Sequence, residues 1–155
     1  ARFWLSIHDQ FRTLGGALKD AGEALREGRM TAEDYRAWYP RRLNRFLGGL
    51  EGHHSIEDYQ FFPLFGAAEP RLAKGFEVLE SDHETIHAAM HAAFDSATAL
   101  LQSIESDRDA LLKAAERHDA DSGRLLKLLA RHLDDEEDLV IPIILDRGEG
   151  PLGIG

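Results

Sequence analysis

Two segments of the sequence place a histidine four residues before a glutamate, with a proline six residues after that glutamate. They are His53 with Glu57 and Pro63, and His132 with Glu136 and Pro142. On an α-helix, residues four apart lie about one turn apart on the same face. Imidazole nitrogen and carboxylate oxygen are ligands that iron, manganese and zinc accept. The repeated spacing therefore predicts a metal site supplied by two helices.

The 155-residue chain contains no cysteine. This excludes disulfides, thiolate-bound zinc, cysteine-ligated iron–sulfur clusters and a thiol nucleophile, so any metal must be held by histidine and carboxylate. Two carboxylates buried without a counter-charge would each destabilise the fold by several kcal/mol. A cation cluster between the helices compensates for that cost, and carboxylates contributed by separate helices suit a two-metal centre.

Composition and helix-breaking residues predict the elements that position these side chains. Leu and Ala supply 42 residues against 14 for Val, Ile and Thr together, a balance that favours helix over sheet. Gly28 ends the first helical stretch, and residues 66–70 separate the second from the third. We expect an all-α domain, an antiparallel up-down four-helix bundle over residues 1–146, followed by a flexible tail at 147–155.

Hydrophobic periodicity places the four helices at residues 2–27, 32–65, 71–103 and 107–145. Thr31 is expected to cap the second helix. Pro40 lacks a backbone N–H, so it either kinks this helix or separates a short leading turn from it. The fourth helix is expected either to be continuous or to break near residues 121–123.

An adjacent pair, His54 and Asp58, has the same four-residue spacing and competes with His53 and Glu57 for the inward position. The repeat favours His53, because His54 corresponds to Leu133 in the second half of the chain, and leucine is no metal ligand. We expect His54 and Asp58 to support the site through hydrogen bonds or to contact another chain.

Each half of the chain also opens with a helix that carries a histidine three residues before an apolar side chain. His8 precedes Phe11, His83 precedes Ile86, and 45 and 49 residues separate these histidines from the two histidine–glutamate pairs. The bundle is therefore predicted to consist of two helix-pair repeats. Each repeat presents one histidine and one histidine–glutamate pair to the centre.

The order of these residues resembles the hemerythrin family, specifically its bacterial hemerythrin-like HHE cation-binding branch, up to about Leu145. That family has the order His, HxxxE, HxxxH, HxxxE, and this chain matches it with His8, His53 with Glu57, His83 with His87, and His132 with Glu136. The resemblance implies a four-helix bundle around two iron ions, a non-haem diiron centre with a bridging oxo or hydroxo group. His83, His87 and His132 would bind one iron, His8 and His53 the other, and Glu57 and Glu136 would bridge them.

The same resemblance implies one open coordination position, at the iron with fewer histidines, where dioxygen, nitric oxide or peroxide binds. Invertebrate oxygen carriers place an aspartate five residues after the last histidine, whereas this chain has Glu137 there and Glu136 at four residues. We assign the bridging role to Glu136. His91 is expected beside the site or exposed. His118 lies roughly 21 Å along a helix from His132 and is expected at the surface.

Reversible binding of dioxygen or a related small ligand, for sensing, storage or delivery, is the function that this interpretation favours. The alternatives are a diiron oxidoreductase acting on peroxide or nitric oxide, and an iron-responsive or iron-storage module. The formal charge of −10 argues against nucleic acid and anionic membranes as partners. No apolar run reaches the roughly 18 residues of a membrane span. We expect a cytoplasmic protein with a redox or signalling protein as its partner.

Overall fold

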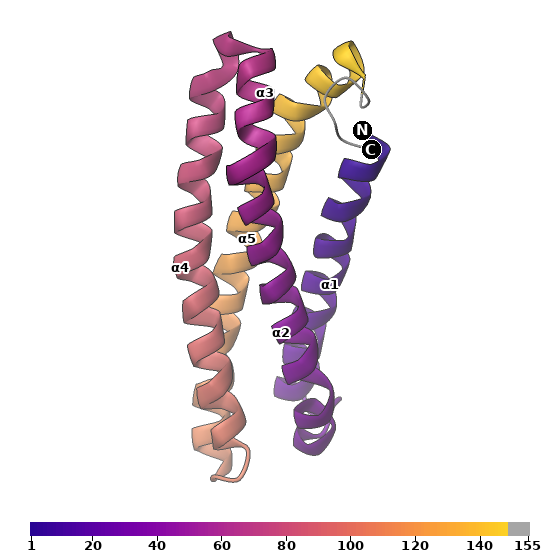
Figure 1. Cartoon of the computed structure of the whole chain (residues 1–155). Coiled ribbons are helices and arrows are strands. Elements are labelled where there is room, and N and C mark those ends of the chain that lie inside the picture. The colour runs from indigo at the N-terminus through magenta and orange to yellow at the C-terminus, as the bar shows by residue number, and fades with distance from the viewer. Residues whose placement is uncertain (149–155) are drawn as a thin grey trace.

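The computed structural model describes residues 1–148, which form helices and no β-strand (Figure 1). The elements are α1 (Arg2–Arg26), α2 (Ala32–Ile56), η1 (Glu57–Phe61), α3 (Phe62–Ala68), η2 (Pro70–Leu72), α4 (Ala73–Ser103) and α5 (Arg108–Arg147). Because α2, η1 and α3 follow one another without a break, the described chain makes four long helical stretches. The all-helical prediction is confirmed for these residues, and four such stretches suit a four-helix bundle.

The connections lie at the two ends of the molecule. In Figure 1 the α1–α2 and α4–α5 connections lie at one end, and the α3–α4 connection lies at the other. The predicted cap at Thr31 is present, since its side chain accepts a hydrogen bond from the backbone N–H of Asp34 at 3.0 Å. Asp107 caps α5 in the same way, through Ala110 at 2.8 Å. Gly28 has a φ of +79°, a left-handed conformation that glycine adopts without a Cβ penalty.

Proline does not interrupt these helices. α2 runs unbroken through Pro40, so no separate leading turn precedes it, and α5 runs unbroken through Pro142. The break considered near residues 121–123 is absent from α5. The second stretch instead changes its winding at η1, a π-helical turn that begins at Glu57. Single π turns inside α-helices occur frequently at functional sites.

Two apolar clusters fill the interior, and a polar layer lies between them. Members of the larger cluster on the four stretches include Leu18, Leu50, Ile86 and Leu129. Members of the smaller cluster include Trp4, Phe62, Leu79 and Val140. On every stretch, buried histidine or glutamate occurs in the segment between these positions. The polar layer is therefore inside the bundle, with apolar packing on both sides.

Among the described residues, each helix is too short or too polar to cross a lipid bilayer. Of the tail predicted at 147–155, Arg147 ends α5 and Gly148 follows it. Positions 149–155 lie outside the described residues.

Candidate metal centre

Seven metal-ligating side chains occupy the polar layer, and all are buried. They are His8 on α1, His53 and His54 on α2, Glu57 at the start of η1, His83 on α4, and His132 and Glu136 on α5. Both glutamates have no solvent-exposed surface. Every one of the four helical stretches thus contributes to the same interior layer.

The seven residues form two groups that share Glu57. One group contains His54, Glu57, His83 and His132, and the other contains His8, His53, Glu57 and Glu136. In each group, one potential ligand atom from every member lies within 4.8 Å of the others. Such spacing is that of donor atoms arranged around a cation. Each of the two adjacent groups could hold a metal ion.

Both carboxylates reach across the two groups. The Oε1 atom of Glu136 lies 3.2 Å from Nε2 of His8, and its Oε2 atom lies 3.2 Å from Nε2 of His132. Glu57 repeats the pattern: Oε2 lies 3.4 Å from Nε2 of His53, and Oε1 lies 3.4 Å from Nε2 of His83. Each carboxylate therefore points one oxygen toward imidazoles of either group, as a carboxylate bridging two metal ions does.

Most of the inward-facing atoms lack a hydrogen-bond partner. Within residues 1–148, no hydrogen-bond partner is present for the four glutamate oxygens, Nε2 of His8 and His53, or either ring nitrogen of His54, all of which are buried. An unpartnered buried polar group costs about 1–3 kcal/mol, and charged groups cost more. Cations bound among these atoms would satisfy them together. The donor set fits iron, manganese or zinc, because it consists of imidazole nitrogen and carboxylate oxygen.

Three of the imidazoles also contact, through Nδ1, a carboxylate that belongs to neither group. Nδ1 of His83 hydrogen-bonds Asp58 at 2.8 Å, Nδ1 of His132 contacts Asp82 at 3.3 Å, and Nδ1 of His8 contacts Glu137 at 3.0 Å. Such contacts direct the opposite nitrogen, Nε2, toward the centre and increase its basicity. Arg12 in turn donates two hydrogen bonds to the carboxylate of Glu137, at 2.9 and 3.0 Å.

Burial keeps several of the imidazoles in the neutral form that binds metal. It lowers the pKa of His53 to about 4, that of His83 to about 4 and that of His54 to about 2. Burial also raises the pKa of Glu57 well above its ordinary value, and the nearby Glu136 carboxylate adds to this effect. Burial alone would raise the pKa of Glu136 too, but contacts with Glu57, His132 and His8 lower it.

The structure brings together six of the seven predicted ligands and leaves His87 outside both groups. The side chain of His87 is 42% exposed, and its Nε2 lies 3.9 Å from Oε1 of Glu51. His54, which was predicted to have only a supporting role, is 3% exposed and belongs to one of the groups. The two histidines exchange places relative to the prediction, and five histidines still face the centre.

The repeat contains a signal for His54 that the prediction interpreted incorrectly. His54 was discounted because it corresponds to Leu133, yet Leu133 is fully buried. A leucine at the matching position shows that the position faces the core. Residues 53, 54 and 57 span only about 100° of helix, so two adjacent histidines can flank the same glutamate.

The remaining predicted positions are partly as expected. Glu136 faces the centre, whereas Glu137 lies behind His8 and binds Arg12. Asp58 contacts His83, a supporting role of the kind predicted for it. His91 is exposed, and its ring centroid lies 5.9 Å from that of His87.

His118 lies inside the bundle, so its predicted surface position is wrong. Its Nδ1 contacts the hydroxyl of Ser96 at 2.9 Å, and its Nε2 faces the hydroxyls of Tyr39 and, at 3.2 Å, Ser122. Burial lowers the pKa of His118 and raises that of Tyr39 to about 12. Three hydroxyl partners from α2, α4 and α5 allow this histidine to be buried without a metal.

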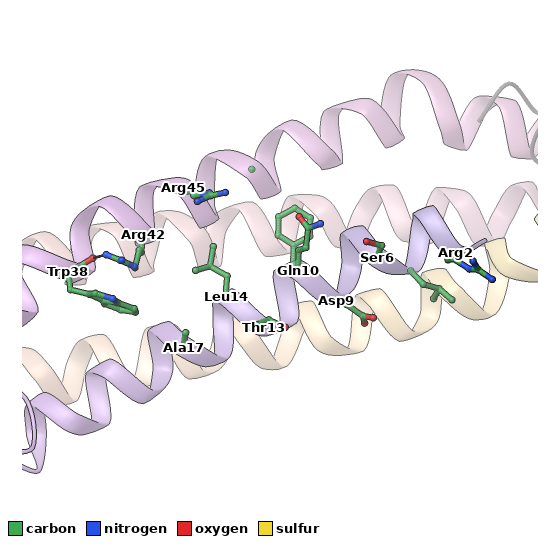
Figure 2. Close-up of a pocket in the computed structure, with 13 residues that line it drawn as sticks. Arg2, Ser6, Asp9, Gln10, Thr13, Leu14, Ala17, Trp38, Arg42 and Arg45 are labelled. Carbon is green, nitrogen blue, oxygen red and sulfur yellow. Dashed lines mark hydrogen bonds between the residues drawn. The ribbon is translucent and has the colours of Figure 1, made fainter. Parts of the chain in front are cut away.

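A groove of about 1000 Å³ lies between α1 and α2 (Figure 2), and its lining residues include none of the seven ligating side chains. Arg42, Arg45 and Trp38 line it from α2, and the guanidinium of Arg42 lies 4.5 Å from the centre of the Trp38 ring. Phe11 also lines the groove and packs against His53, with ring centroids 5.4 Å apart. Phe11 therefore stands between the groove and the polar layer.

Comparison with known proteins identifies one family. The family model described as hemerythrin HHE cation binding domain matches residues 1–145, a range that includes all seven buried ligands. The searches of curated proteins and of solved structures gave no match.

Proposed function

Since this chain belongs to the hemerythrin HHE cation-binding domain family, we propose that its buried residues hold two iron ions and reversibly bind dioxygen or a related small ligand. The observation that carries the proposal is the pair of groups joined by Glu57 and Glu136. Each of these carboxylates faces imidazoles on both sides. One cation would leave half of these donors without a partner, whereas two cations use all of them.

The number of histidines differs between the two groups, and we propose that this difference gives the centre an open side. Three histidines face one cation position, namely His54, His83 and His132, but only His8 and His53 face the other. Two ferrous ions held by these residues would supply the two electrons and the open coordination position that reversible binding of dioxygen requires. The open position would lie on the side of His8 and His53, because that side has fewer histidines.

Aromatic side chains surround the side with fewer ligands. The Trp4 ring packs edge-on against His8 and His53, with centroids 5.8 and 6.1 Å away. Phe11 covers His53 from the direction of the groove. These rings exclude water from the imidazoles, and a dry apolar surrounding slows loss of charge and protons from a bound ligand. It therefore favours reversible binding over turnover.

The carboxylates that contact Nδ1 of the ligating histidines supply negative charge that would balance a pair of divalent cations. Neutral imidazoles and the two shared glutamates carry less negative charge than two divalent ions carry positive charge. Asp58, Asp82 and Glu137 stand directly behind ligating histidines and supply further negative charge at short range. Arg12 holds Glu137 in place through two hydrogen bonds.

The proposal includes the architecture predicted from the sequence, an antiparallel bundle of two helix-pair repeats. It is supported by the way the ligands divide between the pairs. α1, α2 and η1 contribute His8 and a histidine–glutamate pair, and α4 and α5 contribute His83 and a second such pair. Neither cation position would be formed by a single repeat, because each carboxylate faces imidazoles from both helix pairs.

Metal analysis combined with visible absorption tests the proposed function. The protein should contain two iron ions per chain. After anaerobic reduction it should be nearly colourless, develop a charge-transfer band on exposure to dioxygen, and lose that band again on degassing. Irreversible oxidation with consumption of peroxide or nitric oxide would instead favour an oxidoreductase. Iron bound without any response to dioxygen would favour a storage or iron-responsive role, and either result would overturn reversible binding.

A further inference from the structure

A second pocket, of about 390 Å³, opens between α2 and α4 and reaches the metal centre. Its walls carry four carboxylates, Glu51, Asp58, Glu80 and Glu84. Two ligating histidines, His54 and His83, also line it. The pocket therefore connects an acidic part of the protein surface with the donors of one cation position.

His54 marks the inner end of this pocket. It is 3% exposed, and neither of its ring nitrogens has a hydrogen-bond partner. Its ring stacks on that of His83, with centroids 3.8 Å apart and planes 10° apart. An unpartnered buried imidazole that lines an acidic pocket is ready to take a cation arriving from the solvent side.

We propose that this acidic pocket is the route by which divalent cations reach the centre from solvent. The inference rests on the proposed metal centre and deepens it. Carboxylates lining a concave surface raise the local concentration of cations and increase their association rate. Glu80 and Glu84 are exposed on α4, and Glu51 faces them from α2. A cation held there moves inward to the imidazoles of His54 and His83.

The predicted ligand His87 has a place in this route. It lines the pocket at its exposed side, and its Nε2 lies 3.9 Å from Oε1 of Glu51. An imidazole and a carboxylate at this separation offer a hydrated cation its first nitrogen and oxygen donors. His87 would therefore act during uptake while lying outside both groups of final ligands.

The other openings near the centre suit cations less well. The groove between α1 and α2 is lined by three arginines and one carboxylate, Asp9, so its net charge repels cations. Phe11 also separates it from His53. A smaller cavity of about 160 Å³ reaches His132, and its wall carries Asp82 and Asp135 together with Arg131, which offsets one of the two carboxylates. The pocket between α2 and α4 has carboxylates and no Lys or Arg among its lining residues.

Charge removal tests the route through the rate of metal uptake. The variant combines Glu80→Gln with Glu84→Gln, and the control combines Asp95→Asn with Glu116→Gln. The control residues are exposed, lie outside the pocket and produce the same charge change. Uptake of ferrous ion by metal-depleted protein, followed anaerobically by stopped flow, should be about tenfold slower in the pocket variant at low salt. The control should stay within about twofold, and high salt should reduce the difference.

A steric variant tests the same route in the loaded protein, so the test does not depend on the fold of the metal-free form. Ser55 is exposed and lines the pocket, whereas its neighbour Ile56 does not line it. Ser55→Trp should slow exchange of bound iron for ⁵⁷Fe²⁺ by about tenfold or more while leaving two irons per chain, and Ile56→Trp should not. A side chain that blocks the pocket slows binding and release of iron equally, so the number of bound irons stays the same.

Unchanged uptake and exchange rates in the pocket variants, with two irons still bound, would overturn the route and leave the proposed metal centre intact. Equal slowing in the pocket and control variants would also overturn it, since the effect would then not belong to the pocket. Failure of the unmodified protein to bind iron would overturn both the route and the proposed function.

Discussion

Replacing His54 by phenylalanine separates a metal-ligating role from a packing role at the same position. The phenyl ring keeps the stacking of His54 on His83, whose ring centroids are 3.8 Å apart, and removes both nitrogens. His87→Phe is the matched control, because it makes the same change on a side chain that is 42% exposed and lies outside both groups.

The expected loss of affinity follows from the number of ligands in the group. Structural zinc sites with four protein ligands gain about 10–16 kcal/mol on metal binding, which is roughly 2.5–4 kcal/mol per ligand. His54 is one of four protein donors in its group. We therefore expect His54→Phe to weaken that cation position by about 100- to 1,000-fold. His87→Phe should change the affinity less than about threefold.

The metal-free protein should respond in the opposite direction. Without metal, both nitrogens of His54 are buried and unpartnered, a condition that costs about 1–3 kcal/mol. Phenylalanine has no polar atoms to satisfy. Metal-free His54→Phe should therefore unfold at a higher urea concentration than the metal-free original, whereas the iron-loaded variant should unfold at a lower one.

Equilibrium competition with a ferrous chelator measures the affinities, and urea unfolding with and without iron measures the stabilities. Full iron affinity in His54→Phe together with a loss in His87→Phe would refute the assignment of these two residues. A variant equally destabilised with and without iron would show that His54 acts only in packing.

Further predictions concern the residues around the centre and the far half of the bundle. Asp58→Ala, which removes the hydrogen bond to Nδ1 of His83, should weaken one iron about 10- to 100-fold in the chelator competition. Burial lowers the pKa of His118 in the folded protein. Below about pH 6.5 the unfolded chain therefore binds more protons than the folded chain, and the free energy of unfolding decreases as the pH is lowered. Metal-free His118→Gln should lose up to about 1.4 kcal/mol per pH unit of that slope in urea titrations; an unchanged slope would contradict the buried neutral state. Tyr39→Phe, which removes the hydroxyl facing His118, should lower the free energy of unfolding by about 1 kcal/mol, measured in urea at pH 8, and no loss would mean that this contact does not stabilise the fold.

The helices could be predicted from local signals because those signals act over a few residues. Gly28 ends the first stretch and Thr31 starts the second, as the structure shows. For Pro40 the sequence left open a kinked helix or a separate leading turn, and the structure excludes the separate turn. Pro40 lies within an unbroken α2, because packing on neighbouring helices compensates for one missing backbone hydrogen bond. The π turn that begins at Glu57 was not predicted from the sequence.

The site could be predicted only as far as helical spacing determines which side chains face inward. The two histidine–glutamate pairs, His8 and His83 follow such spacing, and all lie in the buried layer. His54 and His87 differ because a helix face is broad, and only the positions of neighbouring helices decide which edge is buried. α4 leaves His87 beside the pocket between α2 and α4, whereas α2 directs His54 toward α4 and α5.

The burial of His118 shows the same dependence on neighbours. A single histidine on a helix carries no sequence signal for hydroxyls on other helices. Ser96, Tyr39 and Ser122 come together around it only in the folded bundle.

Anomalous X-ray diffraction at the iron absorption edge, on crystals of the protein purified with its metal, tests the central claim most directly. We predict two anomalous peaks in each molecule. One should lie among His54, His83 and His132, the other beside His8 and His53, with Glu57 and Glu136 bound to both. A single peak, a peak outside the polar layer, or glutamates that contact only one ion would contradict a shared two-iron centre.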